Sequence, residues 1–358
     1  MSRLLNLLTG RQRYQRALWG LALLVVSARS AGAQEDTVAF PSLGNLSVKV
    51  EGTVTTQNGA AVRLDYKLTN LGGSQQPAAD FLIRALVPFN ASYGMNSPVG
   101  WFASKAIIED SAVARWFAIE ANKFLTAGTS KTGYVTEVNG VLDVVQAWVQ
   151  GEATFPTLEE GQTLGEEPSV YVNSAATLTI GPIPVPAGST VGSLVTRLND
   201  LVSRVCASPQ WITSSGLCTT LAGQLTGNPV DLSAFRDTLT ANRSGGAQLT
   251  DNPYYLLKSN RDYIRYRIDV VTPDGGFGLV YVCGNKFKAR NKTDIPLPAT
   301  YTVQNTSETG SLVLPAKPAG STFSETEFTT TNQGTVKLWY DGVVQRQLTP
   351  TYVACGGP

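Results

Sequence analysis

The hydrophobic positions of the chain follow two different periods, and the changes between them divide the chain into three stretches. From about residue 43 to residue 183, apolar residues recur mainly at every second position. Leu64, Tyr66 and Leu68 alternate with polar neighbours, as expected for a strand with one buried face. Asn70 and a Gly-Gly pair end this strand, and a more buried strand begins at Phe81. Repetition of this pattern predicts an antiparallel sandwich.

Between about residues 186 and 268 the period becomes helical. One continuous apolar stripe comprises Val191, Leu194, Val195, Leu198, Leu201, Val202 and Val205. We expect Ser189 to cap this helix. Further helices are expected around 217–225, around 232–239 after Asp231, and after Asn252-Pro253, where a capping side chain precedes a proline at the first helical position. These helices are short, so they should pack together as a small bundle.

Strands return from Phe277 onward and complete the predicted fold. Residues 286–303 repeat the order of strand, polar break and strand seen in residues 65–83. The last two strands are separated by Asp341-Gly342, which favours a type I′ hairpin. The fold class is therefore mainly β with a helical segment: two immunoglobulin-like antiparallel β-sandwich regions separated by a small helical bundle. The expected boundaries are 1–33 for a signal peptide, 34–185 and 269–358 for the sandwiches, and 186–268 for the helical module.

The N-terminal residues have the pattern of a secretory signal peptide. Several arginines precede a short apolar run, residues 17–28, and Ala31-Gly32-Ala33 fits a small-residue cleavage site. An uncleaved membrane anchor is disfavoured because the run is too short, and no later segment has transmembrane length. Cleavage before Gln34 removes five of the 28 basic residues and none of the 27 acidic ones, leaving a net charge of about −4. This charge argues against a nucleic-acid partner.

The chain has four cysteines, which in an exported protein are expected to form disulfides. Three connectivities are possible. The most economical one pairs Cys206 with Cys218 within the helical stretch and Cys283 with Cys355 across the C-terminal strands. Secreted, extracellular or cell-surface localisation is the corresponding expectation.

Two groups of motifs resemble known bacterial families. The run YKLTN, followed by GSQQPAADFLI and later by SPVGW, resembles the N-terminal sandwich of uncharacterised secreted bacterial proteins. The segments WITSSGLCTTLAGQL, DLSAFRDTL and NPYYLLKSNRDYI resemble the small helical module of the FIMAH type, which occurs in bacterial extracellular proteins. Together they cover about half of the chain. The resemblance implies an exported modular protein with a non-enzymatic or unknown role, and the expected cysteine pair within the module departs from the family pattern.

Catalytic chemistry is limited by the absence of histidine, which excludes histidine-based nucleophile activation and the H-E-x-x-H metal site. The remaining enzymatic alternative is a glycoside hydrolase that uses carboxylates of the 159–167 loop. The candidates are Glu159, Glu160, Glu166 and Glu167. Acidic clusters in such loops are more often solvated, and Ca²⁺ binding through their oxygens is a weaker alternative. We therefore expect neither a catalytic residue nor a resident cofactor.

The candidate binding surface lies in the C-terminal region. Lys286, Lys288 and Arg290 share one face of a strand, which favours an edge strand protected by charge over a basic stripe for an acidic glycan or anionic surface. Trp339 shares a strand face with Lys337, either as a lid over the sheet edge, the favoured interpretation, or as a platform for a ligand ring.

Basic residues of the last helix, Lys258, Arg261 and Arg265, share a helix face that we expect to be solvated. Trp101 is expected to anchor a loop in the core.

Three functional classes stay open at this point. The leading one is a secreted or cell-surface non-catalytic structural and interaction protein, whose partner is a surface polymer or a protein, with a glycan as one case. The second is a carbohydrate-binding protein that uses an aromatic and basic face of the C-terminal sandwich. The third is the hydrolase with the acidic loop.

Overall fold

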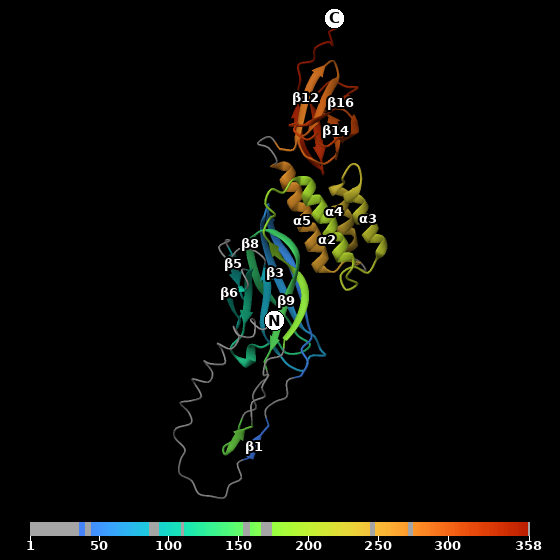
Figure 1. The fold of residues 1–358 in the computed structure, drawn as a ribbon. Helices are drawn as coiled ribbons and strands as arrows, with labels where there is room; N and C mark the ends of the chain where they lie inside the picture. The colour runs from blue at the N-terminus through green and yellow to red at the C-terminus, as the bar shows by residue number, and fades with distance from the viewer. Residues whose placement is uncertain are drawn as a thin grey trace.

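A computed structural model of the protein describes residues 36–39, 44–85, 93–108, 111–152, 158–165, 174–243, 248–270 and 275–356. The expected signal peptide, residues 1–33, lies outside this set. Three blocks follow one another along a long axis: an N-terminal β block, a helical block and a C-terminal β block (Figure 1). The fold class expected from the sequence is confirmed, because antiparallel sheets at both ends flank four helices. Among the described residues, no helix combines the length and apolar character needed to cross a membrane.

The N-terminal block consists of two facing sheets. One has the order β2-β3-β8-β5, and its strands are Val48–Asn58, Ala61–Asn70, Ser130–Asn139 and Tyr93–Asn96 in that order. The other has the order β11-β9-β4-β7-β6, with strands Ser174–Ile183, Val141–Gly151, Ala78–Ala85, Ser111–Phe117 and Phe102–Ile108. The register is antiparallel throughout both sheets. A short parallel pair, β1 (Asp36–Val38) with β10 (Gln162–Leu164), lies apart from both sheets.

Aromatic side chains fill the space between these two sheets. Phe81 and Trp116 stack with ring centroids 5.1 Å apart, and Tyr134 meets Phe81 edge-on at 5.3 Å. Burial removes water from the Tyr134 hydroxyl and raises its pKa. Trp101 is buried in this core and its Nε1–H donates to the Lys123 carbonyl at 3.1 Å, so the expected loop anchor is confirmed.

The helical block contains α2 (Val191–Cys206), α3 (Ser215–Thr226), α4 (Leu232–Arg243) and α5 (Asp251–Asp269). The seven apolar residues of the expected stripe are all buried on α2. Two expected caps are wrong. Thr190, one residue beyond Ser189, caps α2 because its hydroxyl accepts from the Ser193 N–H at 3.1 Å. α5 begins after Thr250, so Asn252 lies inside the helix and is buried.

The C-terminal block is a sandwich of a three-stranded and a four-stranded sheet. The order β12-β13-β16 comprises Phe277–Cys283, Lys286–Asn291 and Ser324–Thr329. The order β15-β14-β17-β18 comprises Thr309–Leu314, Leu297–Val303, Val336–Tyr340 and Val343–Leu348. This distribution of consecutive strands between two sheets is that of an immunoglobulin-like sandwich. The turn before β18 has φ angles of 53° at Asp341 and 73° at Gly342, as a type I′ hairpin requires.

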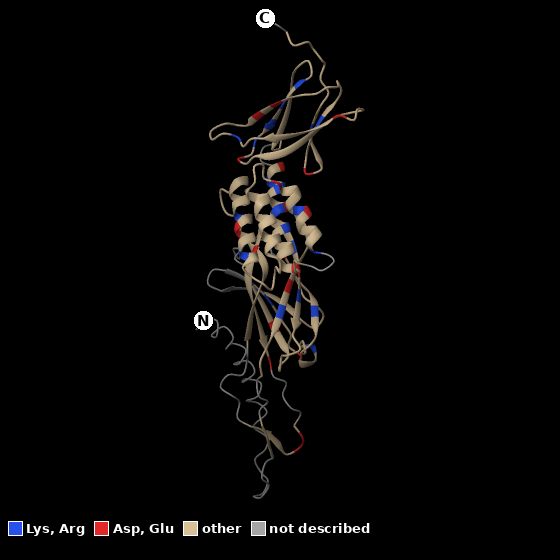
Figure 2. Ribbon diagram, turned by 90° about the vertical axis from the view of Figure 1, so that its right-hand side faces the viewer, with Lys and Arg blue, Asp and Glu red and all other residues tan. Residues whose placement is uncertain are grey.

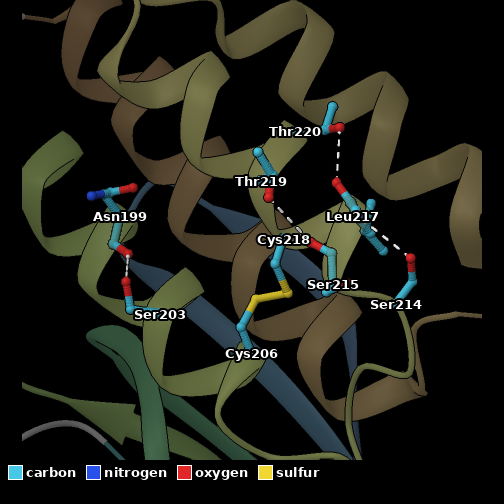
Figure 3. Close-up of a disulfide and its surroundings, with 10 residues drawn as sticks. Asn199, Ser203, Cys206, Ser214, Ser215, Leu217, Cys218, Thr219 and Thr220 are labelled. Carbon is cyan, nitrogen blue, oxygen red and sulfur yellow. Dashed lines mark hydrogen bonds between the residues drawn. A yellow bond between two sulfur atoms is a disulfide. The ribbon is translucent and has the colours of Figure 1, made fainter.

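Both disulfides join the pairs named from the sequence. Cys206 at the end of α2 is bonded to Cys218 in the first turns of α3 (Figure 3). Cys283 at the end of β12 is bonded to Cys355, which holds the C-terminal segment against that strand. The Gly284 N–H also donates to the Val353 carbonyl at 2.7 Å. No free cysteine occurs in the described chain.

The similar sequence patterns in the two β blocks correspond to similar buried corners. In each, an asparagine at the end of a strand donates from Nδ2 to the carbonyl of the residue before a proline. Asn70 donates to Gln76 at 3.0 Å, and Asn291 donates to Ile295 at 2.8 Å. Each Nδ2 also reaches a distant segment, at Leu125 or at Pro315. The polar break in both patterns is therefore a structural turn whose carbonyls are satisfied by a buried amide.

Candidate functional site

Trp339 lies on the outer face of the four-stranded C-terminal sheet. Its strand, β17, runs between β14 and β18, so the expectation that Trp339 covers a sheet edge is wrong. The side chain is half-buried, and its Nε1–H donates to the Thr302 hydroxyl at 2.9 Å. Lys337 is half-buried on the same face, opposite Thr302 and Gln347. The indole N–H is therefore already used within the protein.

Two of the basic residues of the other C-terminal sheet share one carboxylate. Lys288 Nζ and Arg290 Nε lie 3.1 and 2.8 Å from carboxylate oxygens of Glu325 on β16. Hydrogen bonds from these two cations hold the pKa of Glu325 below its ordinary value. β13 is the middle strand of its sheet, so the expectation of an edge strand is also wrong. Lys286 remains exposed.

The aromatic and basic residues do not form one surface. Trp339 and Lys337 belong to the outer face of one sheet, whereas Lys286, Lys288 and Arg290 belong to the outer face of the other. The buried faces of both sheets lie between them, with Phe287 and Leu338 in the core. The combined aromatic and basic face expected from the sequence is a misinterpretation, because alternation along one strand cannot tell which sheet that strand joins.

The acidic loop is only partly described. Glu159 and Glu160 are exposed, and the Glu159 N–H donates to the Gln162 side chain at 2.9 Å. Glu166 and Glu167 lie outside the described residues. Within the described residues, no group of three or more histidine, cysteine, aspartate or glutamate side chains is arranged to hold a metal ion.

The junction between the helical block and the C-terminal block contains a cluster of charges centred on Asp341. The carboxylate of Asp341 pairs with Arg261, and Arg236 Nη1 lies 2.9 Å from it. Arg265 approaches the same carboxylate at 3.6 Å and lies over the Tyr340 ring at 4.9 Å. Arg261 is only 4 % exposed, so the expected solvated face of α5 is wrong at this position. Burial also raises the pKa of Tyr340.

A second aspartate strengthens this junction. Asp294, in the loop before β14, accepts from the Gly192 N–H at 3.0 Å, at the N-terminus of α2. The free N–H groups and the macrodipole of a helix N-terminus favour a negative charge there. The Val230 N–H donates to the Pro296 carbonyl at 3.1 Å. Asp294 and Asp341 of the C-terminal block thus both meet positive features of the helical block.

The junction with the N-terminal block depends mainly on amides. Asn252 on α5 accepts from the Gly52 N–H at 2.7 Å and donates to the Val50 carbonyl at 2.9 Å. Asn260, about two turns further along α5, donates to the Leu142 carbonyl at 3.0 Å. These contacts satisfy backbone groups of β2 and β9 that a docked helix would otherwise bury unpaired.

Two arginines of α2 complete this junction. Arg197 donates to the Leu142 carbonyl at 3.0 Å and lies 2.7 Å from the Asp143 carboxylate. Arg204 also pairs with Asp143 at 2.7 Å. Acidic and basic positions are interleaved over the helices (Figure 2). A shallow hollow of about 190 Å³ lies between β2 and α5, with Thr56, Tyr255 and Asp262 in its wall.

The junction residues were not recognised from the sequence. Asn252 has the pattern of a helix cap because it precedes Pro253 at the start of a helix. Arg261 has the pattern of a solvated cation because it shares a helix face with other basic residues. One usable signal was the high density of polar residues on α5, because a helix that packs on several sides usually carries few of them. The partner atoms are far away in sequence and could not be named from it.

Comparisons with known proteins give no family. No family model matches the chain, and no curated protein matches it. Among solved structures, an uncharacterised immunoglobulin-like protein from Nocardia farcinica is 12 % identical, covering 38 % of this chain and 99 % of that one, with a TM-score of 0.22. A CBM3 of Hungateiclostridium clariflavum is 12 % identical over 26 % of this chain and 72 % of its own, with a TM-score of 0.22.

A cohesin module from a Clostridium perfringens family 33 glycoside hydrolase is 16 % identical, covering 40 % of this chain and 98 % of that one, with a TM-score of 0.18. TM-scores this low carry no argument about the fold or the ligand of the present chain.

Proposed function

We propose that the mature chain is an exported, non-catalytic structural and interaction protein whose helical block holds two β-sandwiches at a fixed separation. The observation that carries this proposal is the pair of bonded junctions. Asn252 ties α5 to the N-terminal block, and Arg261 of the same helix ties it to the C-terminal block. Nine residues, or about 13 Å of helix, separate these two attachments, so a single rigid element spans the distance.

In this proposal the three blocks have the expected boundaries, 34–185, 186–268 and 269–358, and they move together as one rigid body. The junctions are unlike the flexible linkers that permit domain motion, because side chains bury and satisfy backbone groups across them. An exported location is supported by the two disulfides and the N-terminal sequence pattern. The role that fits this architecture is to present one sandwich to a partner while the other sandwich stays at a fixed distance from it.

Distance measurements between the two sandwiches test the proposal. Non-natural amino acids at the exposed positions Gly73 and Ser321 accept spin labels without disturbing the disulfides. We expect one narrow distance distribution for the mature chain. A broad distribution at the same labels would contradict a rigid spacer, whatever the sandwiches bind.

A test of the non-catalytic role uses the acidic loop. Glycosidase or esterase turnover by the purified mature chain, abolished by Glu159→Gln, would overturn it. Loss of turnover on Glu51→Gln, an acidic residue paired with Lys49 on β2, would instead indicate a contaminant or a general loss of structure.

A further inference from the structure

The outer face of the five-stranded N-terminal sheet carries three aromatic side chains on different strands. Phe102 on β6 is 53 % exposed and stacks on Phe117 of β7, with ring centroids 5.8 Å apart. Trp148 on β9 is half-buried and shares this outer face, because it is the register partner of Leu82, itself the partner of Arg115. The core lies on the opposite side, where Trp116 and Val149 are buried.

The rings extend across most of the sheet. The strand order β9-β4-β7-β6 places Trp148 three strands from Phe102, or about 14 Å at the usual strand spacing. Phe117 lies between them. Phe117 is in contact with Phe102 and with the Arg115 guanidinium, so ring surface is presented mainly at two separated points, Phe102 and Trp148. Two separated rings on one face suit an extended chain with apolar ring faces better than a small molecule.

One pair of opposite charges on this face, Asp80 and Arg115, is cancelled internally. Arg115 Nε lies 3.0 and 2.9 Å from the two carboxylate oxygens of Asp80, which is 2 % exposed. The guanidinium also lies over the Phe117 ring at 5.0 Å. Hydrogen bonding to Asp80 raises the pKa of Arg115 despite its burial, so the pair stays charged and mutually neutralised. This pair therefore offers a charged ligand no uncompensated countercharge beside Phe117.

Polar groups beside Trp148 are available for hydrogen bonding. Gln146 and Gln150 lie two residues on either side and share its face, because side chains alternate along a strand. Among the residues that the structure describes, neither amide nor the Trp148 indole N–H has a hydrogen-bond partner. Trp339 differs, since its indole N–H is bonded to Thr302.

We infer that this face binds a neutral, extended polysaccharide. Sugar rings present apolar C–H faces that pack on aromatic rings. Their hydroxyls accept from an indole N–H, and both accept from and donate to side-chain amides. The inference adds a ligand class to the interaction role proposed above and places it on the N-terminal sandwich, at Phe102, Phe117 and Trp148. It does not depend on the rigidity of the helical block.

Affinity electrophoresis of the mature chain in gels containing hydroxyethyl cellulose, glucomannan or dextran tests this inference. At least one of these neutral polymers should retard the chain. Trp148→Ala should weaken the retardation about tenfold and Phe102→Ala about threefold, as expected for lost ring contacts at a binding site. Trp148→Phe keeps a ring without the N–H and should retain part of the binding. The matched control, Trp339→Ala, should leave it unchanged.

Several outcomes would overturn the inference. One is the absence of retardation by all three polymers. Another is retardation that only Trp339→Ala removes. Binding that disappears in high salt, or that occurs only with the anionic polymer alginate, would indicate an electrostatic ligand. Capture from a cell-surface extract that depends on Trp148 and survives periodate oxidation of the glycans would indicate a protein partner instead. A narrow distance distribution between the sandwiches would stand in each of these cases.

Discussion

The two junctions of the helical block do the same mechanical work with different chemistry. The N-terminal junction relies on neutral amides that bond to strand backbone, as Asn252 does at Val50 and Gly52. The C-terminal junction relies on charge, with Asp341 facing a group of arginines and Asp294 facing the N-terminus of α2. Amide bonding is directional and independent of salt, whereas charge pairing depends on the partner remaining ionised and on screening.

The difference follows from what each sandwich presents to the helices. The N-terminal block presents strand backbone, which demands donors and acceptors in a fixed register. The C-terminal block presents a hairpin turn and a loop, where aspartates are common and backbone groups are partly satisfied within the turn. A single helix, α5, meets both demands with different residue types along its length.

The largest effect is expected at the centre of the charged junction. Asp341→Asn removes the charge while keeping a side chain that tolerates the positive φ of this position. Because Arg261 stays buried without this counter-charge, the free energy of unfolding should fall by about 3 kcal/mol. Chemical denaturation followed by circular dichroism measures this loss.

The spin-label pair provides a second readout for Asp341→Asn. The distance distribution between the sandwiches should broaden, because the C-terminal block loses its main attachment. Arg236→Gln is the matched control, since this arginine is more exposed and should cost much less. If Asp341→Asn leaves both the denaturation midpoint and the distance distribution unchanged, then the charges do not hold the junction.

The neutral junction is tested at Asn252. Asn252→Ala leaves the Gly52 N–H and the Val50 carbonyl buried without partners, so we expect a loss of about 2 kcal/mol. Hydrogen exchange should accelerate at the Gly52 amide in particular. Unlike the effect of Asp341→Asn, this loss should be the same at low and high salt, and a strong salt dependence would contradict the proposed division between the junctions.

The sequence specified the blocks but not the way they are joined. Alternating residues such as Leu64 and Leu68, and the apolar stripe from Val191 to Val205, identify the elements because burial within one block follows the period of its own backbone. Asn252 and Arg261 contact other blocks, and neither periodicity nor capping rules report on a partner 200 or 80 residues away. Local signals therefore assigned them to a cap and a solvated face.

The candidate surfaces show a similar limit. Trp339 and the Lys286–Arg290 strand were correctly placed on outward strand faces, yet sheet membership separates them. The Gln-x-Trp-x-Gln pattern around Trp148 was readable as a polar strand face with one aromatic residue. Its flanking segments are apolar, as in a core strand, and Phe102 and Phe117 join it only once strand order is known.

A smaller effect is expected for the second aspartate of the charged junction. Asp294→Asn keeps an acceptor for the Gly192 N–H but removes the charge at the N-terminus of α2, so we expect a loss of about 0.5 kcal/mol. Asp294 is exposed, and the effect should disappear in 1 M NaCl. Unfolding curves at two salt concentrations decide this. A loss that persists at high salt would mean that the carboxylate acts through its hydrogen bond to Gly192 rather than through its charge.

The smallest effect is expected where charge also occurs in the neutral junction, at Asp143. Arg204 pairs with it but is 43 % exposed, so Arg204→Gln should cost less than about 0.5 kcal/mol. Arg197 is less exposed, and besides the Leu142 carbonyl it donates to the buried Asn260 Oδ1 at 2.7 Å. Arg197→Gln should cost more, because the Leu142 carbonyl keeps only the bond from Asn260 and the Asn260 oxygen loses its donor. The order of these two losses is the sharpest form of the comparison. If Arg204→Gln costs as much as Arg197→Gln, then the charge on Asp143 rather than the bond to the strand backbone holds α2 in place, and the N-terminal junction works in the same way as the C-terminal one.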